Sequence, residues 1–197
     1  WSAASPRNTG DLIQAAERVG AALHLMDEAW WGPTIVMEGE DRARMLFTER
    51  SMPGCIMVNR RGQRFVNESV AYTTAVQAMY RPDTAGNVNL PAFALQPARV
   101  RRRFLKSADT IAGLAAQLGV NGAGLAATVA KFNEFATSGV DADFHRGENS
   151  YDLLYGDVRL GPNPCLAPIA EGPFHGIEIC PGDIGTNGGL LTNAKAQ

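Results

Sequence analysis

The segment from Gly54 to Tyr72, which reads GCIMVNRRGQRFVNESVAY, constrains the fold more than any other part of the sequence. Its first apolar stretch, Cys55–Asn59, is typical of a buried strand. Arg60–Gln63 predicts a hairpin turn, with Gly62 at the position that favours a positive φ. Arg64–Val66 is then the expected partner strand. A hairpin of this kind fixes where the following residues leave the sheet.

The helix after this hairpin holds the first candidate for chemistry. Asn67-Glu68 opens a helix predicted from about Val70 to Tyr80, and its first turn holds Tyr72. Side chains in this place point off the end of a sheet, where clefts form. A tyrosine near a helix N-terminus has a mildly stabilised phenolate and suits general acid–base chemistry. The residue pattern alone favours the plainer interpretation, in which Tyr72 is a half-buried packing residue.

Hydrophobic periodicity and turn residues predict the remaining elements. Helices are expected from Asp11 to about Gly20, from Thr110 to Leu118, closed by Gly119, and from Gly122 to Ser138, closed by Gly139. Short strands are expected at Ala21–Leu25, Thr34–Met37, Leu90–Leu95, Phe174–Ile179 and Leu190–Thr192. The remaining segments are a turn at Gly32-Pro33, a strand or helix at Arg42–Glu49, and an irregular surface segment over 139–165 with one helical turn near Tyr151. The sequence therefore predicts an α+β fold.

Nine residues near the C-terminus, Pro181-Gly-Asp-Ile-Gly-Thr-Asn-Gly-Gly, hold four glycines between two predicted strands. Because glycine has no Cβ, the backbone of such a loop can approach a flat or charged ligand closely. A tight structural turn explains the same composition equally well. The sequence predicts a loop here and leaves its role open.

Composition limits the class of protein. The 197 residues are 45% hydrophobic and 19% charged, which is enough apolar material for the core of one domain or slightly more. A net charge of −2 argues against a dedicated nucleic-acid binder. No apolar run is long enough to predict a membrane span, and the N-terminus lacks the pattern of a signal peptide. One basic cluster is interpreted as a solvated face: Arg99, Arg101, Arg102, Arg103 and Lys106.

Side chains that bind metals are scattered along the chain. The three cysteines and three histidines lack the spacing of a disulfide framework or a zinc site. Reduced cysteines are the default in the cytosol, so we expect a cytoplasmic protein. Asp141, Asp143 and Asp152 do not match the spacing of a helix–loop–helix calcium loop, and we interpret them as turn formers. We therefore predict no metal site.

Four segments carry a resemblance to a known family. Asn8-Thr-Gly-Asp precedes Met26-Asp-Glu-Ala-Trp-Trp-Gly-Pro, and the second segment runs from Pro53 to Ser69, followed by Tyr72. The last two segments are Phe132-Asn-Glu-Phe-Ala continuing to Pro162-Asn-Pro, and Gly172-Pro-Phe continuing to Gly189. In this order they resemble the flavoprotein family of fumarate reductases and 3-ketosteroid dehydrogenases. They cover most of the chain, and their combination is specific although each alone is weak.

Within this family, the Asp-Glu-Ala-Trp-Trp-Gly-Pro and Pro-Gly-Asp-Ile-Gly-Thr segments resemble the ketosteroid dehydrogenase branch. Fumarate reductases carry a histidine where this chain has Gly185, and an arginine near the place of Tyr72. An anionic dicarboxylate needs such cationic partners. Their absence from these positions favours a neutral, apolar substrate such as a steroid.

The resemblance implies FAD as the cofactor and a 3-ketosteroid or another apolar ketone as the substrate. It gives Tyr72 a catalytic role in removing the proton next to the keto group, while hydride passes from the neighbouring carbon to the flavin. It also implies Asn67 and Glu68 as substrate contacts. The implied cofactor-binding residues are Gly10, Asp11, Gly185, Thr186, Asn187, Gly188 and Gly189.

The resemblance further implies a division of the chain. Residues 31–170 correspond to the cap domain, which holds substrate and catalytic groups, of a fumarate reductase-like flavoprotein. Residues 1–30 and 171–197 correspond to flanks of its FAD-binding domain. The sequence lacks a G-x-G-x-x-G fingerprint after a strand and begins with Trp1. We therefore expect a piece whose partner is the missing FAD-binding portion of the same polypeptide, and which is inactive alone.

The leading expectation is a 3-ketosteroid Δ1-dehydrogenase. A 3-ketosteroid 4-dehydrogenase, a fumarate reductase-like enzyme and a stand-alone ligand-binding module without a redox role stay as alternatives. Two departures from the family pattern accompany the resemblance. The stretch between Ala92 and Ala108 is shorter than expected, and His175 stands where a tyrosine is common.

Overall fold

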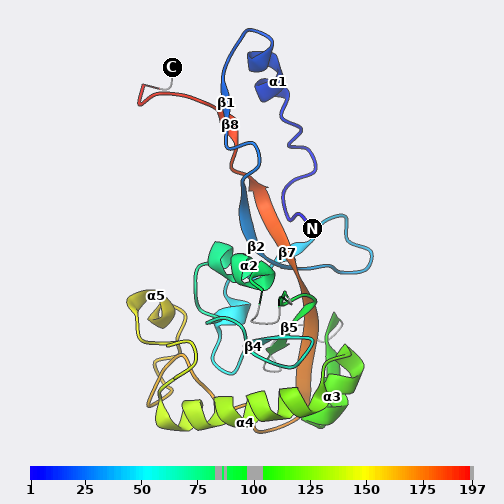
Figure 1. The fold of residues 1–197 in the computed structure, drawn as a ribbon, viewed down its shortest axis with the longest axis vertical. Coiled ribbons are helices and arrows are strands. Elements are labelled where there is room, and N and C mark those ends of the chain that lie inside the picture. The colour runs from blue at the N-terminus through cyan, green and yellow to red at the C-terminus, as the bar shows by residue number, and fades with distance from the viewer. Residues whose placement is uncertain (83–85, 87, 97–103, 196–197) are drawn as a thin grey trace.

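The computed structural model describes residues 1–82, 86, 88–96 and 104–195, and Figure 1 shows how the elements are arranged. The helices are α1 (Asp11–Glu17), α2 (Tyr72–Tyr80), α3 (Ile111–Leu118), α4 (Gly122–Ser138) and α5 (Ser150–Leu153), with a 3-10 turn η1 at Glu49–Ser51. The strands are β1 (Leu23–His24), β2 (Ala29–Ile35), β3 (Arg44–Met45), β4 (Ile56–Asn59), β5 (Ala92–Gln96), β6 (Lys106–Ala108), β7 (Phe174–Thr186) and β8 (Gly189–Leu190). The predicted mixture of helices and strands is confirmed.

The long strand β7 organises the fold. It pairs antiparallel with β5 and β6 through its first half and with β2 through its second half. The larger sheet has the order β3-β2-β7-β5-β4, with β6 also paired to β7, and β1 and β8 form a separate two-stranded ribbon. In Figure 1, β7 leads from a body that contains α2, α3 and α4 to a narrow arm that contains α1, β1 and β8.

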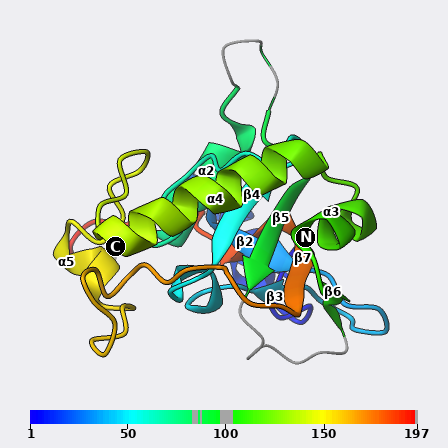
Figure 2. The same cartoon turned by 90° about the horizontal axis from the view of Figure 1, so that it is seen from below.

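Two apolar clusters cover opposite faces of the central strands. Alternate residues of β4 point to opposite faces, as the period of a strand requires, so Ile56 and Val58 face one cluster and Met57 faces the other. The first cluster packs against α3 and α4, and Figure 2 shows α4 lying across β4 and β5. The second cluster packs against α2 through Ala78 and Met79. Burial on both faces explains the apolar run Ile56–Val58 in β4.

The predicted glycine loop at Pro181–Gly189 is wrong over most of its length, because β7 continues to Thr186. Pro33 lies opposite Pro181, so the two residues that lack an N–H share one position in the ladder. A Cβ on Gly182 would lie 2.2 Å from the carbonyl oxygen of Trp1. Glycine there serves close packing of neighbouring chain segments within a strand, and only the turn into β8 remains a loop.

Three other predictions need correction. The Gly32-Pro33 pair lies inside β2 and forms no turn. The helix α2 starts at Tyr72, after the predicted Val70. The expected return strand reduces to a single bridge between Val58 and Arg64, because the chain then turns away to bury its polar side chains.

The glycine signals were accurate elsewhere. Gly62 has a φ of 76° in the predicted hairpin turn. α3 and α4 end at Gly119 and Gly139, whose φ angles are 71° and 81°. The side chain of Asn121 caps the start of α4 by accepting a hydrogen bond from Gly124 N at 2.7 Å.

The arm buries little of its own apolar surface. No residue of α1 is buried, and Leu12 and Val19 are 74% and 86% exposed. Of the predicted basic cluster, Arg99 to Arg103 lie outside the described residues, and Lys106 donates to the carbonyl of Gln117 at 2.6 Å. In the described part of the chain, no helix has the length and apolar character needed to cross a bilayer.

Candidate active site

Tyr72 is the first residue of α2 and is half-buried above β2. Its ring meets the ring of Phe47 edge to face, with the centroids 5.6 Å apart. The next residue of the helix, Thr73, donates a hydrogen bond to the carbonyl of Trp31 at 3.3 Å. A Cβ on Gly32 would lie 2.2 Å from the Met45 side chain and 3.6 Å from the Tyr72 Cβ. Glycine at this point of β2 therefore lets β3 and α2 pack over the strand.

The two residues predicted to open α2 lie in the turn before it, and both are buried. Glu68 is 0% exposed and Asn67 is 7% exposed. The Asn67 amide donates to the Asp152 carboxylate at 2.8 Å, and its oxygen accepts from Ser69 N at 2.8 Å. These side chains are committed to the protein interior, and the helix begins at Tyr72 after an N-cap at Ala71.

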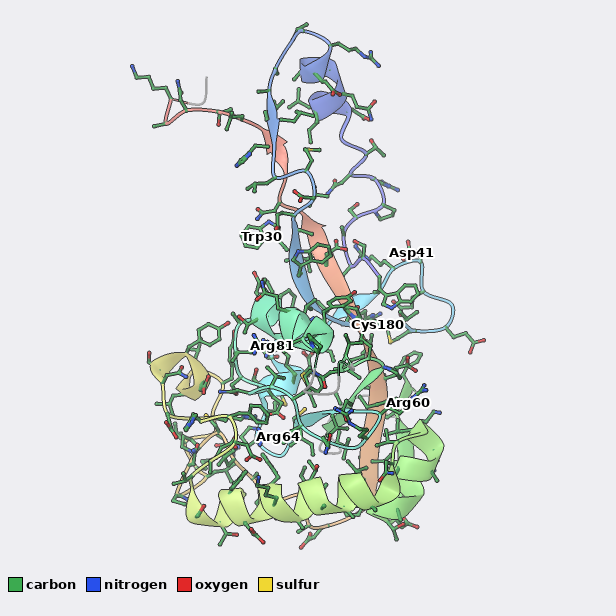
Figure 3. All side chains as sticks on the ribbon, viewed as in Figure 1. Trp30, Asp41, Arg60, Arg64, Arg81 and Cys180 are labelled. Carbon is green, nitrogen blue, oxygen red and sulfur yellow. The ribbon has the colours of Figure 1, made fainter. Side chains whose placement is uncertain are left out.

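Glu68 is the centre of a buried ionic network. Its carboxylate accepts hydrogen bonds from Arg64 at 2.8 Å and 2.9 Å and from Arg146 at 3.1 Å. It also accepts one from Met57 N at 3.1 Å, which ties the turn to β4. Arg64 reaches on to the carboxylate of Asp141 at 2.9 Å, and Figure 3 shows Arg64 in the body above α4. Charges without water need such partners, so the network fixes the turn that leads into α2.

Asp141 has a larger role than the turn former that was predicted. It does shape its own turn, because its Oδ1 accepts from the backbone of Asp143 at 3.2 Å and of Phe144 at 3.3 Å. Burial would raise the pKa of the Asp141 carboxyl, but hydrogen bonds and charge from Arg64 outweigh this and hold that pKa below its usual range. The partners are 77 residues apart in the chain, so no local sequence signal pairs them.

Two buried arginines, Arg146 and Arg50, hold backbone carbonyls around the same turn. Arg146 donates to the carbonyls of Ser51 and Cys55, each at 2.8 Å, and of Met52 at 3.0 Å. Arg50 donates to the carbonyl of Glu68 and, at 2.6 Å, to that of Val70. Sequence reasoning missed these contacts, because an arginine in a 3-10 turn or an irregular segment is usually exposed.

The predicted cofactor-binding residues lie in the arm or at its base. Gly10 is the N-cap of α1 with a φ of 75°, and Asp11 accepts a hydrogen bond from Thr9 at 2.7 Å. Gly185 and Thr186 end β7, where Thr186 lies opposite Ala29 of β2. α1 contacts β8, so the two groups of predicted residues belong to one part of the molecule.

The glycines near β8 fall into two kinds. A Cβ on Gly188 would lie 2.3 Å from the carbonyl oxygen of Leu25, so this glycine is required by contact between two backbone segments. Asn187 N donates to the carbonyl of Glu28 at 2.9 Å and closes the same contact. A Cβ on Gly185 or Gly189 meets no atom within 4 Å, so the backbone there is open to a ligand.

The strand β2 connects the predicted cofactor-binding residues at the base of the arm with Tyr72 in the body. Its first residues pair with the end of β7 in the arm, and its Trp31 and Gly32 lie beneath α2 and Tyr72. Trp30 lies between them on β2 and is 48% exposed, and Figure 3 shows it beside the ribbon above α2. Within the described residues, no group of three or more histidine, cysteine and acidic side chains is placed to hold a metal ion.

Known proteins match the chain throughout. The FAD binding domain family matches residues 1–197. The 3-oxosteroid 1-dehydrogenase of Mycobacterium tuberculosis (strain ATCC 25618 / H37Rv) is 42% identical over 221 residues, which cover 100% of this chain and 39% of that protein. This chain therefore spans about two fifths of the length of the curated relatives it matches.

Two solved structures have the same fold. The 3-ketosteroid delta1-dehydrogenase from Sterolibacterium denitrificans, in complex with 1,4-androstadiene-3,17-dione, matches with a TM-score of 0.88 and 41% identity, over 98% of this chain and 38% of that one. The open conformation of a flavocytochrome c3 fumarate reductase matches with a TM-score of 0.64 and 25% identity, over 94% of this chain and 30% of that one. The chain therefore belongs to the FAD binding domain family, which confirms the predicted flavoprotein family and its cofactor, FAD.

Proposed function

We propose that this chain is part of an FAD-dependent 3-ketosteroid Δ1-dehydrogenase, in which Tyr72 takes the proton next to the 3-keto group. The observation that carries the proposal is the place of Tyr72, at the start of α2 and half-exposed beside Phe47. The 42% identity to a 3-oxosteroid 1-dehydrogenase over the whole chain supports the same reaction.

The position of Tyr72 suits a proton acceptor. Tyr72 is the first residue of α2 and is only partly buried, so its phenol can be presented to a substrate and exchange a proton with it. The contact with Phe47 leaves the ring one preferred orientation and offers an apolar edge to a steroid. Asn67 and Glu68, both buried, position the preceding turn in this proposal and do not contact substrate.

The residues at the base of the arm fit a flavin. FAD supplies the hydride acceptor of the reaction when it is bound. The open backbone at Gly185 and Gly189 is suited to a flat ring that must approach within van der Waals distance. Thr186 and Asn187 lie between these glycines, and Gly10 and Asp11 belong to the same arm. We propose these residues as the flavin-facing part of this chain.

We further propose that residues 31–170 form the cap domain and that residues 1–30 and 171–197 are flanks of the FAD-binding domain. The arm supports this division, because Leu12 and Val19 are 74% and 86% exposed and have no cover within the described chain. The remaining FAD-binding portion of the polypeptide is their proposed partner. The chain alone is then expected to bind little FAD and to have no turnover, and stoichiometric flavin absorbance of the purified 197-residue chain would contradict this.

A fumarate reductase-like reaction is the second candidate, since the fold also matches a flavocytochrome c3 fumarate reductase. A dicarboxylate needs cationic side chains at its carboxylates. The Tyr72 ring is instead packed on Phe47, with Met45 and Gly32 beneath the same helix start. This apolar surrounding favours a neutral ketone.

The Tyr72→Phe variant of the full-length enzyme tests the proposal. Turnover of a 3-ketosteroid with an artificial electron acceptor should fall by roughly 100-fold or more, because the phenol that receives the proton is lost. The control is Tyr80→Phe at the other end of α2, where the side chain is 55% exposed, and its kcat should be unchanged. Full activity of Tyr72→Phe removes Tyr72 from the mechanism, and activity on fumarate instead of the steroid identifies the second candidate.

A further inference from the structure

One short segment contacts both the ring of Tyr72 and the backbone that leads to it. Phe47 meets the ring at 5.6 Å between centroids. Three residues later, Arg50 donates to the carbonyl of Glu68 and, at 2.6 Å, to the carbonyl of Val70, two residues before Tyr72. The Ser51 hydroxyl also donates to the Glu68 carbonyl, at 3.2 Å. The segment from Phe47 to Ser51 therefore contacts both the Tyr72 ring and the turn that leads into Tyr72.

We propose that Arg50 is a positioning residue for Tyr72, which it holds in place through the carbonyls of Glu68 and Val70. The inference rests on the proposed function of Tyr72 as proton acceptor. The terminal nitrogens of Arg50 donate to the turn that precedes α2, and its effect on the reaction passes through that turn.

Burial explains why an arginine is required here. Arg50 is 1% exposed, and its two terminal nitrogens are committed to carbonyl oxygens. A planar guanidinium presents two donors in a fixed fork, whereas the lysine ammonium is a single point on a flexible stem. Lysine therefore keeps the charge but cannot hold both carbonyls in one geometry. The arginine acts as a rigid spacer between η1 and the turn.

The segment that carries Arg50 is itself held in place by Arg146. Arg146 donates to the carbonyls of Ser51 at 2.8 Å and Met52 at 3.0 Å, which flank the end of η1. The same guanidinium donates to the Glu68 carboxylate at 3.1 Å. Arg146 therefore binds both η1 and the turn before α2, and Arg50 makes a second connection between them. Since a displacement of about 1 Å in a reacting group can cost around 100-fold in rate, this rigidity matters for proton transfer.

A double-mutant cycle in the full-length holoenzyme tests the inference. Arg50→Lys should lower kcat by roughly 10-fold in the enzyme that keeps Tyr72, with KM and FAD content little changed. In the Tyr72→Phe background the same change should lower kcat by less than about 2-fold, because the group being positioned is gone. The control Arg159→Lys, at an arginine whose side chain is 76% exposed, should leave kcat unchanged in both backgrounds.

The outcomes separate the inference from the function on which it rests. An equal loss from Arg50→Lys in both backgrounds, or no loss in the enzyme with Tyr72, overturns the positioning role. Full activity of Tyr72→Phe alone overturns the proposed function of Tyr72. If Arg50→Lys yields no folded holoenzyme, Ser51→Ala replaces it in the cycle, since it removes the hydroxyl that shares the Glu68 carbonyl. A Ser51→Ala effect that persists without Tyr72 then counts against the inference.

Discussion

Glu68 shows how one buried carboxylate can organise the turn before a proposed catalytic residue. Its oxygens accept from Arg64, from Arg146 and from the backbone of Met57. Burial of both partners makes each of these contacts costly to break, because the charge that is left behind has no water to solvate it. The role of this residue is therefore to fix the turn before Tyr72.

The first prediction is that Glu68→Gln destabilises the chain by about 3–5 kcal/mol, since Arg64 and Arg146 would keep their charges without their common partner. The free energy of unfolding is measured by denaturant titration. The control is Glu40→Gln, which removes an ion pair whose Arg44 side chain is 56% exposed and should cost less than about 1 kcal/mol. Equal losses in the two variants would show that the buried network contributes no more stability than an exposed ion pair.

The second prediction concerns acid. The folded state holds the pKa of Asp141 below its usual range, through Arg64, so the unfolded chain binds a proton there more readily. The resulting stability is present above the unfolded value of about 3.9 and is lost as the pH falls through the lower, folded value. Asp141→Asn should therefore flatten the fall of unfolding free energy between about pH 5 and pH 2, measured by urea titration. A slope identical to that of the parent chain would refute this.

At the scale of elements, β7 carries the connection between body and arm. Its pairing with β5 buries its first half in the body, and its pairing with β2 extends the larger sheet out to Thr186. The following turn into β8 is closed by contact of Gly188 with the backbone of Leu25. Gly188 packs against neighbouring backbone whereas Gly189 does not, so alanine substitutions at these two glycines form a matched pair.

The third prediction compares two of these glycines. Gly188→Ala should disrupt the β1–β8 ribbon, because the new methyl would lie 2.3 Å from the Leu25 carbonyl oxygen. Gly189→Ala meets no atom within 4 Å and should keep the fold. Amide hydrogen exchange of Leu191, whose N–H donates to the Ala22 carbonyl at 2.8 Å, measures the ribbon directly. In the full-length enzyme, Gly189→Ala should weaken FAD retention if a flavin approaches there, whereas unchanged exchange in Gly188→Ala would contradict the packing argument.

Local signals predicted local structure well and long-range structure poorly. Gly62, Gly119 and Gly139 were identified correctly because a positive φ is a property of one residue and its neighbours. The course of β7 through Pro181 was missed, since only the pairing with Pro33 shows that a missing N–H does no harm there. For the site, Tyr72 was singled out by its place at a helix start and by family resemblance.

The arginines that surround the site could not have been foreseen in the same way. Arg50 and Arg146 lie 96 positions apart by their numbers in the chain, and both are buried only because the fold brings η1 to the irregular segment after α4. No spacing rule connects such residues. Most of their contacts are with backbone carbonyls, which no residue type marks, and the acidic partner of Arg146, Glu68, lies 78 positions away in the chain.

The whole molecule consists of a body with its own core and an arm without one. The body buries two apolar clusters, whereas α1 in the arm buries no residue. A surface helix is normally stabilised by one apolar face in contact with a neighbour. Since relatives such as the 3-oxosteroid 1-dehydrogenase extend well beyond the matched region, the arm is the part of this chain that we expect a longer polypeptide to cover.

The last prediction tests this cover. Leu12→Ser and Val19→Ser should change the unfolding free energy of the 197-residue chain by less than about 0.5 kcal/mol each, because these side chains are 74% and 86% exposed. In the full-length protein each change should cost about 1.5–3 kcal/mol, since the same side chains would be buried there. Val158→Ser, at a residue of the body that is 91% exposed, should be neutral in both. If the two arm variants are as harmless in the full-length protein as in this chain, the arm is a free surface, and residues 1–30 do not belong to a larger FAD-binding domain.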